Sequence, residues 1–144
     1  MRKLWKLMMG LSFILGLVLV ILSLIKGGCS GTIETAAGGT VPMKCHWAFR
    51  AVAGQAAVVA VLSLVAVCFK ASSRRRALAL SIVLVDLLIL AVLYFLIGVC
   101  GSAAMACVGN RTLVAIVTVI DIAVVLIAAM LPTPEKEEMP KAKV

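Results

Sequence analysis

Four long apolar segments, separated by short polar stretches, constrain the fold of this chain more than any other feature. Their predicted bounds are residues 7–25, 47–69, 77–99 and 112–131. A helix needs about 20 apolar residues to cross the hydrocarbon core of a bilayer, so each segment is long enough to span it. The chain is 64% hydrophobic, whereas soluble domains are about 45–50% apolar. We therefore predict an all-α integral membrane protein, a four-transmembrane-helix bundle over residues 1–131 followed by a disordered tail at 132–144.

The first apolar segment follows a basic N-terminus, as the core of a signal peptide would. Such a core has about 7–15 residues and this segment is longer, so we expect a retained helix. Residues 26–46, between the first and second segments, contain several glycines and Pro42, so we expect an irregular polar loop there.

The distribution of basic residues predicts the orientation of the bundle. The formal net charge is +8, but Lys and Arg stand in clusters between apolar segments and not in a stripe interleaved with aromatics, which argues against nucleic-acid binding. The N-terminus, the loop at 70–76 and the tail hold ten Lys and Arg, while the two other loops with their flanks hold four. Because basic residues are enriched on the cytoplasmic side, we predict cytoplasmic termini and two extracytoplasmic loops.

The two halves of the chain resemble each other. Residues 17–29 align without gaps against residues 88–100, and each copy is followed by a Met-x-Cys step, Met43 to Cys45 and Met105 to Cys107. We interpret this as a duplicated helical hairpin, a parallel repeat with a pseudo-twofold axis along the membrane normal. The competing interpretation is that two unrelated hairpins share an apolar composition.

Cysteines are concentrated in the two predicted outer loops. Cys29 and Cys45 belong to one loop, Cys100 and Cys107 to the other, and Cys68 stands apart near the end of the second segment. An oxidising outer compartment favours structural disulfides, and each loop supplies one even pair, although four cysteines allow three pairings. The alternative is thiol-redox exchange with a quinone, but no Cys-x-x-Cys is present to tune a reactive thiolate. We expect Cys68 to be a small buried residue.

Soft metal ligands occur at the same two places. They are Met43, Cys45 and His46 in the first half, and Met105 and Cys107 in the second. Thioether, thiolate and imidazole groups suit Cu(I), and a His with a Met suits haem. The simpler interpretation is an interfacial histidine beside an anchoring aromatic residue, Trp47.

Asp86 and Asp121 are the only carboxylates inside the predicted spans. A charged side chain at the bilayer centre costs at least about 2.5–3.5 kcal/mol on insertion scales, so each must face the bundle or a partner. They would hydrogen-bond to Gln55 or Ser63, dock a Lys or Arg of another membrane protein, or form a proton or cation path. We favour the structural or docking roles.

The steps Met43-Lys44-Cys45-His46-Trp47 and Leu96-Ile97-Gly98-Val99-Cys100 carry a resemblance. With Met105-x-Cys107, they make the chain similar, over about residues 7–131, to a family of small bacterial four-span membrane proteins, a domain of unknown function with the serial four-four-one-eight. The resemblance implies four helices, these cysteines and an accessory role beside ABC-transporter permeases. It implies no activity.

These observations favour a non-enzymatic protein of the bacterial cytoplasmic membrane, an accessory subunit or partner of a larger complex such as an ABC transporter, or a self-associating one. The alternative is an extracytoplasmic thiol-redox or copper- or haem-binding protein that uses the Met-x-Cys-His site. No hydrolase triad, phosphate loop or zinc motif is present, which leaves little for enzyme catalysis.

The predicted orientation is testable with reporters. A fluorescent reporter fused behind Val144 should stay on the cytoplasmic side, and a membrane-impermeant thiol reagent should reach Cys45 only from outside after reduction. A reporter found outside, or Cys45 labelled only from within, would contradict the orientation.

Overall fold

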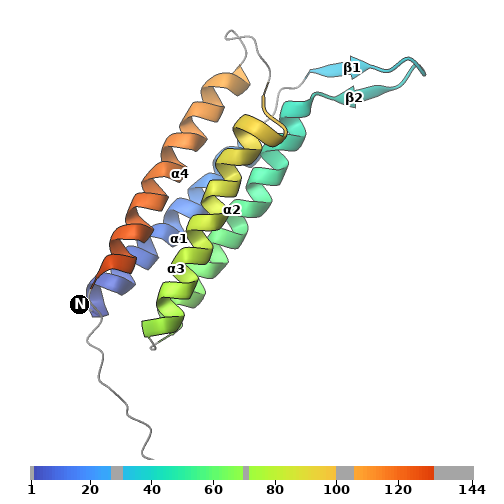
Figure 1. Cartoon of the computed structure of the whole chain (residues 1–144). Helices are drawn as coiled ribbons and strands as arrows, with labels where there is room; N and C mark the ends of the chain where they lie inside the picture. Colours follow the sequence, from blue (N-terminus) through green and yellow to red (C-terminus); the bar gives the residue numbers. More distant parts are fainter. Residues whose placement is uncertain (1, 27–30, 70–71, 100–105, 132–144) are drawn as a thin grey trace, which may run out of the picture.

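The structure is a computed structural model that describes residues 2–26, 31–69, 72–99 and 106–131, and in these residues four long helices lie side by side (Figure 1). The elements in chain order are α1 (Arg2–Ile25), β1 (Thr32–Glu34), β2 (Thr40–Pro42), α2 (Lys44–Cys68), α3 (Ser72–Ala91), the π-helix η1 (Val92–Leu96) and α4 (Ala106–Met130). The predicted tail at 132–144 lies outside the described residues. We call the end of the bundle that carries the two strands the hairpin end, and the opposite end the N-terminal end.

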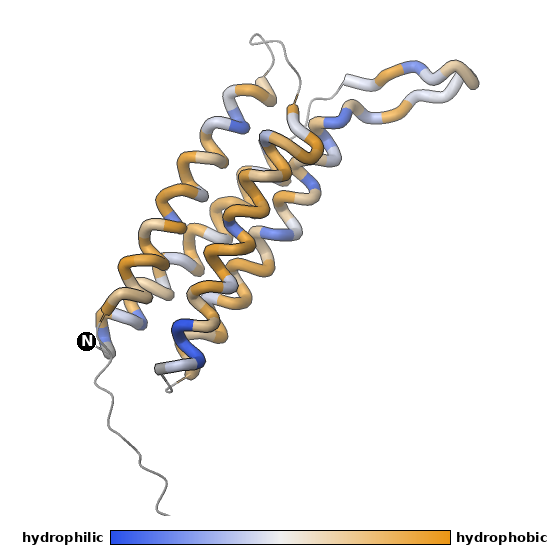
Figure 2. Tube along the Cα trace, viewed as in Figure 1, coloured by the Kyte–Doolittle hydropathy of each residue, from blue (hydrophilic) through white to orange (hydrophobic). Residues whose placement is uncertain are grey.

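All four helices are long and apolar enough to cross a membrane, which confirms the predicted four-helix membrane fold. Figure 2 shows hydrophobic residues along the whole length of each helix and hydrophilic residues gathered at the start of α3. The helices begin earlier than the apolar segments: α2 begins at Lys44 and α4 at Ala106. A helix satisfies its own backbone hydrogen bonds, so it continues past the hydrocarbon until a residue breaks it.

The helices form a ring in which each packs against two neighbours. α1 lies between α2 and α4, and α3 lies between the same two helices on the other side. Only 28–39% of the residues in the apolar part of each helix are buried, so most of each helix surface faces outward. This is the pattern expected when lipid, not water, surrounds the bundle.

α1 and α2 approach each other closely at Gly16. A Cβ atom added to Gly16 would lie 3.1 Å from the backbone nitrogen of Ala60 and 3.2 Å from its Cα. Small residues at a crossing let two membrane helices approach until their backbones touch, which gains van der Waals contact. α1 and α2 therefore form a tightly packed pair.

Arg75 ties three helices together at the N-terminal end. Its guanidinium lies 5.5 Å from the ring centroid of Trp5, and its Nε donates a hydrogen bond to the carbonyl of Phe69 at 3.0 Å. The indole Nε1 of Trp5 in turn donates to the carbonyl of Ala66 at 3.4 Å. Arg75 is buried, whereas Arg74 and Arg76 beside it in α3 are exposed. Arg75 is therefore part of the packing of α1, α2 and α3.

The sequence predicted an irregular loop at residues 26–46, but part of this loop is a regular β-hairpin. β1 and β2 form an antiparallel hairpin in which Thr32 pairs with Pro42, Ile33 with Val41 and Glu34 with Thr40. The turn is closed by Thr35, which donates from its backbone N–H to the carbonyl of Gly39 at 2.7 Å and accepts from the backbone N–H of Gly39 at 3.1 Å. Both strands are exposed along their whole length and project beyond the helices (Figure 1).

The π-helix η1 widens the last turn before the second loop. Both Ile97 N–H and Gly98 N–H donate to the carbonyl of Val92, at 3.2 Å and 3.1 Å. Gly98 has a φ of 67°, the left-handed conformation that glycine adopts without strain at the end of a helix. This turn contains Tyr94, which lines a groove described below.

Replacement of Gly16 by leucine should destabilise the bundle by about 1–3 kcal/mol, because the new side chain has to separate α1 from α2. Gly10 lies in the same helix, and a Cβ atom added there would meet no neighbouring atom within 4 Å, so Gly10→Leu is the matched control. Thermal unfolding in mild detergent, followed by circular dichroism, measures both. Equal effects of the two substitutions would contradict the close packing at Gly16.

Candidate functional site: a polar layer inside the bundle

Each of the four helices contributes one fully buried polar side chain to a common layer near the middle of the bundle. All four side chains have an exposed fraction of 0%, and they are Ser12 of α1, Ser63 of α2, Asp86 of α3 and Asp121 of α4. Most other buried residues are apolar, so a layer that includes two carboxyl groups is the place where chemistry or specificity is expected.

Helical phase directs the two carboxyl groups inward. Asp86 lies four residues after Ile82 and three before Ile89, and all three are completely buried. Asp121 lies four residues before Val125, which is also completely buried. Residues spaced by three and four share one face of a helix, so both aspartates belong to the stripes that pack the core. Of the two orientations predicted from the sequence, toward the bundle or toward a partner, the structure has the first.

The two serines connect α1 with α2 by hydrogen bonds. The Oγ atoms of Ser12 and Ser63 are 2.9 Å apart, and Ser63 Oγ lies 2.8 Å from the carbonyl of Val59, to which it donates. Either hydroxyl can be the donor in the Ser12–Ser63 hydrogen bond. The two hydroxyl groups therefore form a short chain that ends on a backbone carbonyl.

The two aspartates meet between α3 and α4. Their carboxyl groups interact with each other, and Ser12 lies beside Asp121. None of the four carboxyl oxygens has a hydrogen-bond donor among the described residues, and no Lys, Arg or His of this part of the chain pairs with them. The predicted hydrogen bonds from Gln55 or Ser63 to an aspartate are not formed, and Gln55 Oε1 is itself buried without a partner.

This arrangement offers only oxygen atoms, and its carboxyl groups need a positive partner or a proton. A buried carboxylate without one is strongly unfavourable, because the bundle interior cannot solvate a charge as water does. The polar layer is therefore suited to holding a proton or a small cation, and nothing in it resembles a nucleophile with an adjacent base.

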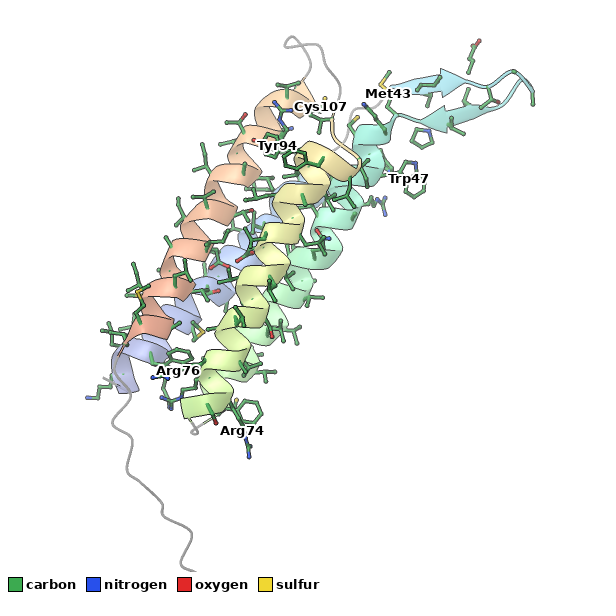
Figure 3. The ribbon with its side chains drawn as sticks, in the orientation of Figure 1. Met43, Trp47, Arg74, Arg76, Tyr94 and Cys107 are labelled. Carbon is green, nitrogen blue, oxygen red and sulfur yellow. The ribbon has the colours of Figure 1, made fainter. Side chains whose placement is uncertain are left out.

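Of the predicted sulfur ligands, the structure describes Met43, Cys45 and Cys107, and these lie at the hairpin end. Met43, Trp47 and Cys107 are at this end of the bundle, and Arg74 and Arg76 are at the other (Figure 3). Cys45 and Cys107 are buried at the starts of α2 and α4.

The side chain of Met43 lies against Gly31, and His46 meets the ring of Trp47 edge-on with centroids 5.6 Å apart. Within the described residues there is no disulfide and no group of three or more His, Cys, Asp or Glu side chains that would hold a metal ion. Cys29, Cys100 and Met105 lie outside the described residues, so the disulfide, redox, copper and haem interpretations stay predictions. Cys68, expected to be buried, is exposed at the end of α2.

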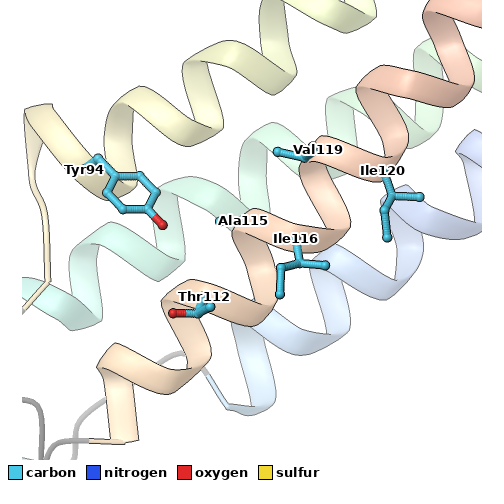
Figure 4. A pocket seen from close by; sticks show the side chains of 6 residues that line it. All are labelled: Tyr94, Thr112, Ala115, Ile116, Val119 and Ile120. Carbon is cyan, nitrogen blue, oxygen red and sulfur yellow. The ribbon is translucent and has the colours of Figure 1, made fainter.

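A groove that the sequence did not predict lies on the outside of the bundle, between η1 and α4 (Figure 4). It has a volume of about 300 Å³ and is lined by Tyr94, Thr112, Ala115, Ile116, Val119 and Ile120. The guanidinium of Arg111 lies 4.9 Å from the ring centroid of Tyr94, close to the Thr112 end of the groove. The sequence signal was present: residues spaced by three and four along α4 form one apolar stripe that faces away from the core.

Ser63 and Ser81 allow the serine link to be tested against a matched control. Both hydroxyls donate to a carbonyl of their own helix, at 2.8 Å and 3.0 Å, but only Ser63 also pairs with another helix. Ser63→Ala should lower the free energy of unfolding by about 0.6 kcal/mol, the average for hydrogen bonds between membrane helices. Ser81→Ala should change it by less. Unfolding by SDS in mixed micelles measures both, and equal losses would mean that the Ser12–Ser63 link contributes nothing.

Comparison with known proteins is consistent with this geometry and adds no activity to it. No curated protein and no solved structure matches the chain. A family model described as "Domain of unknown function (DUF4418)" matches residues 10–132, which include α2, α3, η1 and α4 in full and the last two thirds of α1. The chain therefore belongs to this family of unknown function, as the resemblance predicted.

Proposed function

We propose that the protein is a small non-enzymatic subunit of a larger complex in the bacterial cytoplasmic membrane, with an ABC-transporter permease as the first partner class to test. The observation that carries the proposal is the β-hairpin, which stands clear of the bundle and exposes an apolar pair. A second copy of this chain is the competing partner, and the experiment below separates the two.

All residues of the two hairpin strands are exposed. A two-stranded hairpin is marginally stable in water by itself, and both of its edges offer unpaired backbone groups to another strand. Ile33 and Val41 form a cross-strand pair on one face and are 52% and 45% exposed, respectively. Apolar side chains on a projecting hairpin are suited to a partner's surface, and burying them would stabilise both the hairpin and the complex.

The groove between η1 and α4 supports the same proposal at membrane depth. It is open toward the lipid, and β-branched side chains line most of it. A neighbouring transmembrane helix gains van der Waals contact by filling such a recess, since no hydrophobic driving force operates between helices in lipid. The nearby Arg111 and the hydroxyl groups of Tyr94 and Thr112 offer polar contacts at one end of it.

The duplicated-hairpin interpretation is part of the proposal, and burial on α2 and α4 supports it. Each of the six buried residues of α4 lies 62 positions after a buried residue of α2. The pairs are Cys45 and Cys107, Val52 and Val114, Ala56 and Thr118, Val59 and Asp121, Ser63 and Val125, and Ala66 and Ala128. Two hairpins that pack with the same helix faces inward are expected of a parallel repeat.

Burial on α1 and α3 follows the same rule with an offset of 70 positions, for example from Gly16 to Asp86 and from Leu19 to Ile89. The offset is 71 at Gly27 and Gly98 in the sequence. The extra residue falls in the region of η1, where a π-helical turn takes up more chain than an α-helical one.

We propose, from the positive-inside rule, that the hairpin lies outside the cytoplasm. Arg74 and Arg76 are exposed at the N-terminal end, where cytoplasmic lipid headgroups would meet them, and the hairpin is at the opposite end. A partner that binds the hairpin would therefore contribute an extracytoplasmic segment as well as a transmembrane helix.

A photo-reactive amino acid in place of Ile33 can identify the partner, and the same amino acid in place of Thr32 is the matched control. Thr32 is its neighbour on the other face of the same strand, so the two probes differ only in which face they label. In membranes of the source organism, irradiation should yield a crosslinked product from position 33 at least several-fold stronger than from position 32. Mass spectrometry of that product identifies the partner.

A permease subunit in the product supports the proposal in full. A crosslinked dimer of this chain supports self-association and contradicts the permease. Equal products from both positions, or none from either, would contradict docking through the apolar face of the hairpin.

A further inference from the structure

We propose that Asp86 and Asp121 form a proton-binding site in the middle of the bilayer, in which the two carboxyl groups hold one proton between them. The inference goes beyond the partner role proposed above and does not depend on it. It rests on three features of the polar layer: its burial, the lack of a cation, and the shortage of hydrogen-bond donors for the four carboxyl oxygens.

Burial excludes two free charges at this place. Both aspartates are completely inaccessible, and their four oxygens have no hydrogen-bond donor among the described residues. Two carboxylates side by side in an apolar interior repel each other and lack solvation, so both cannot be ionised together.

No basic group of the described chain faces the pair. The described residues of α1 beyond Lys6 and of α2 beyond Arg50 carry no charged side chain, and α3 and α4 carry none near the layer except the two aspartates. The nearest cations along α3 and α4 are Arg76, ten residues before Asp86, and Arg111, ten residues before Asp121. Arg76 is exposed at the N-terminal end of the bundle, and Arg111 is engaged with Tyr94 near the other end. About three helical turns, or 15 Å, therefore separate each cation from the pair.

The hydrogen-bonding capacity of the layer fits one proton. Two ionised carboxylates offer each other only acceptors, whereas a pair with one proton forms an O–H···O⁻ bond, which is among the strongest hydrogen bonds in proteins. Ser12 lies beside Asp121, and its hydroxyl has a single proton, which can satisfy at most one of the four carboxyl oxygens. A proton from solution is therefore needed to link the two carboxyl groups.

The site lies between α3 and α4. None of the described glycines makes a close backbone contact between these two helices, as Gly16 does between α1 and α2. α1 and α2 meet at Gly16 and Ala60, while α3 and α4 meet at the carboxyl pair. Removal of the proton would leave two negative charges facing each other across this interface. We therefore expect release of the proton to loosen α3 from α4.

The composition of the chain makes this directly measurable. Asp86 and Asp121 are its only aspartates, so protein grown on carboxyl-¹³C aspartate shows two side-chain signals, both from the site. In nanodiscs of neutral lipid at pH 7, carbon NMR should show one proton for the two carboxyl groups, and raising the pH should remove it in a single step. The melting temperature should fall over the same step.

Asp86→Asn and Asp121→Asn each leave one labelled carboxyl and assign the two signals, and the double variant should lose the fall in melting temperature. Two ionised carboxylates at pH 7 would overturn the proposal, as would two carboxyls that stay protonated at every pH at which the bundle is folded. Signals that shift when choline replaces sodium at constant pH would assign the site to a metal cation and overturn it as well. The measurement on the unaltered chain decides the question even if a variant does not fold.

Discussion

The need to satisfy every polar group without water governs this bundle. Hydrocarbon offers no hydrogen-bond partner, so a polar side chain between the two ends of a helix has to find one inside the protein. Ser63 donates to its own helix, Ser12 is linked to Ser63, and Thr118 donates to the carbonyl of Val114 at 2.8 Å. Among the described residues, Ser23 Oγ, Gln55 Oε1 and the carboxyl oxygens of Asp86 and Asp121 are exceptions. Of these groups only the carboxyls can carry a charge, and for that reason the two aspartates are the most informative residues.

The two halves of the bundle are held by different forces. α1 and α2 pack through small residues at Gly16 and Ala60, a contact that depends on shape and is insensitive to solution conditions. The interface of α3 and α4 instead contains the carboxyl pair, whose contribution depends on charge. In such a bundle, a change in the protonation of the carboxyl pair would alter the packing of α3 against α4, while α1 and α2 would keep their arrangement.

The sequence was sufficient for the fold because hydropathy alone identifies helices that cross a membrane. It placed Asp86 and Asp121 in the spans, but one of the options it offered, hydrogen bonds to Gln55 or Ser63, is not formed. The sequence could not choose among the options, because side-chain direction depends on the mutual rotation of four helices. The hairpin was missed because glycines dominated the interpretation of residues 26–46, although Thr, Ile and Val alternate with polar residues there. Arg75 was counted as a loop charge, and only the position of Trp5 shows why it is buried.

The π-helix has a mechanical consequence for α3. A turn with hydrogen bonds of longer range is wider and less regular than the turns before it, so it interrupts the rigid rod between Asp86 and Tyr94. We therefore expect a change in shape at the rim near Gly98 to be taken up in this turn before it reaches Asp86.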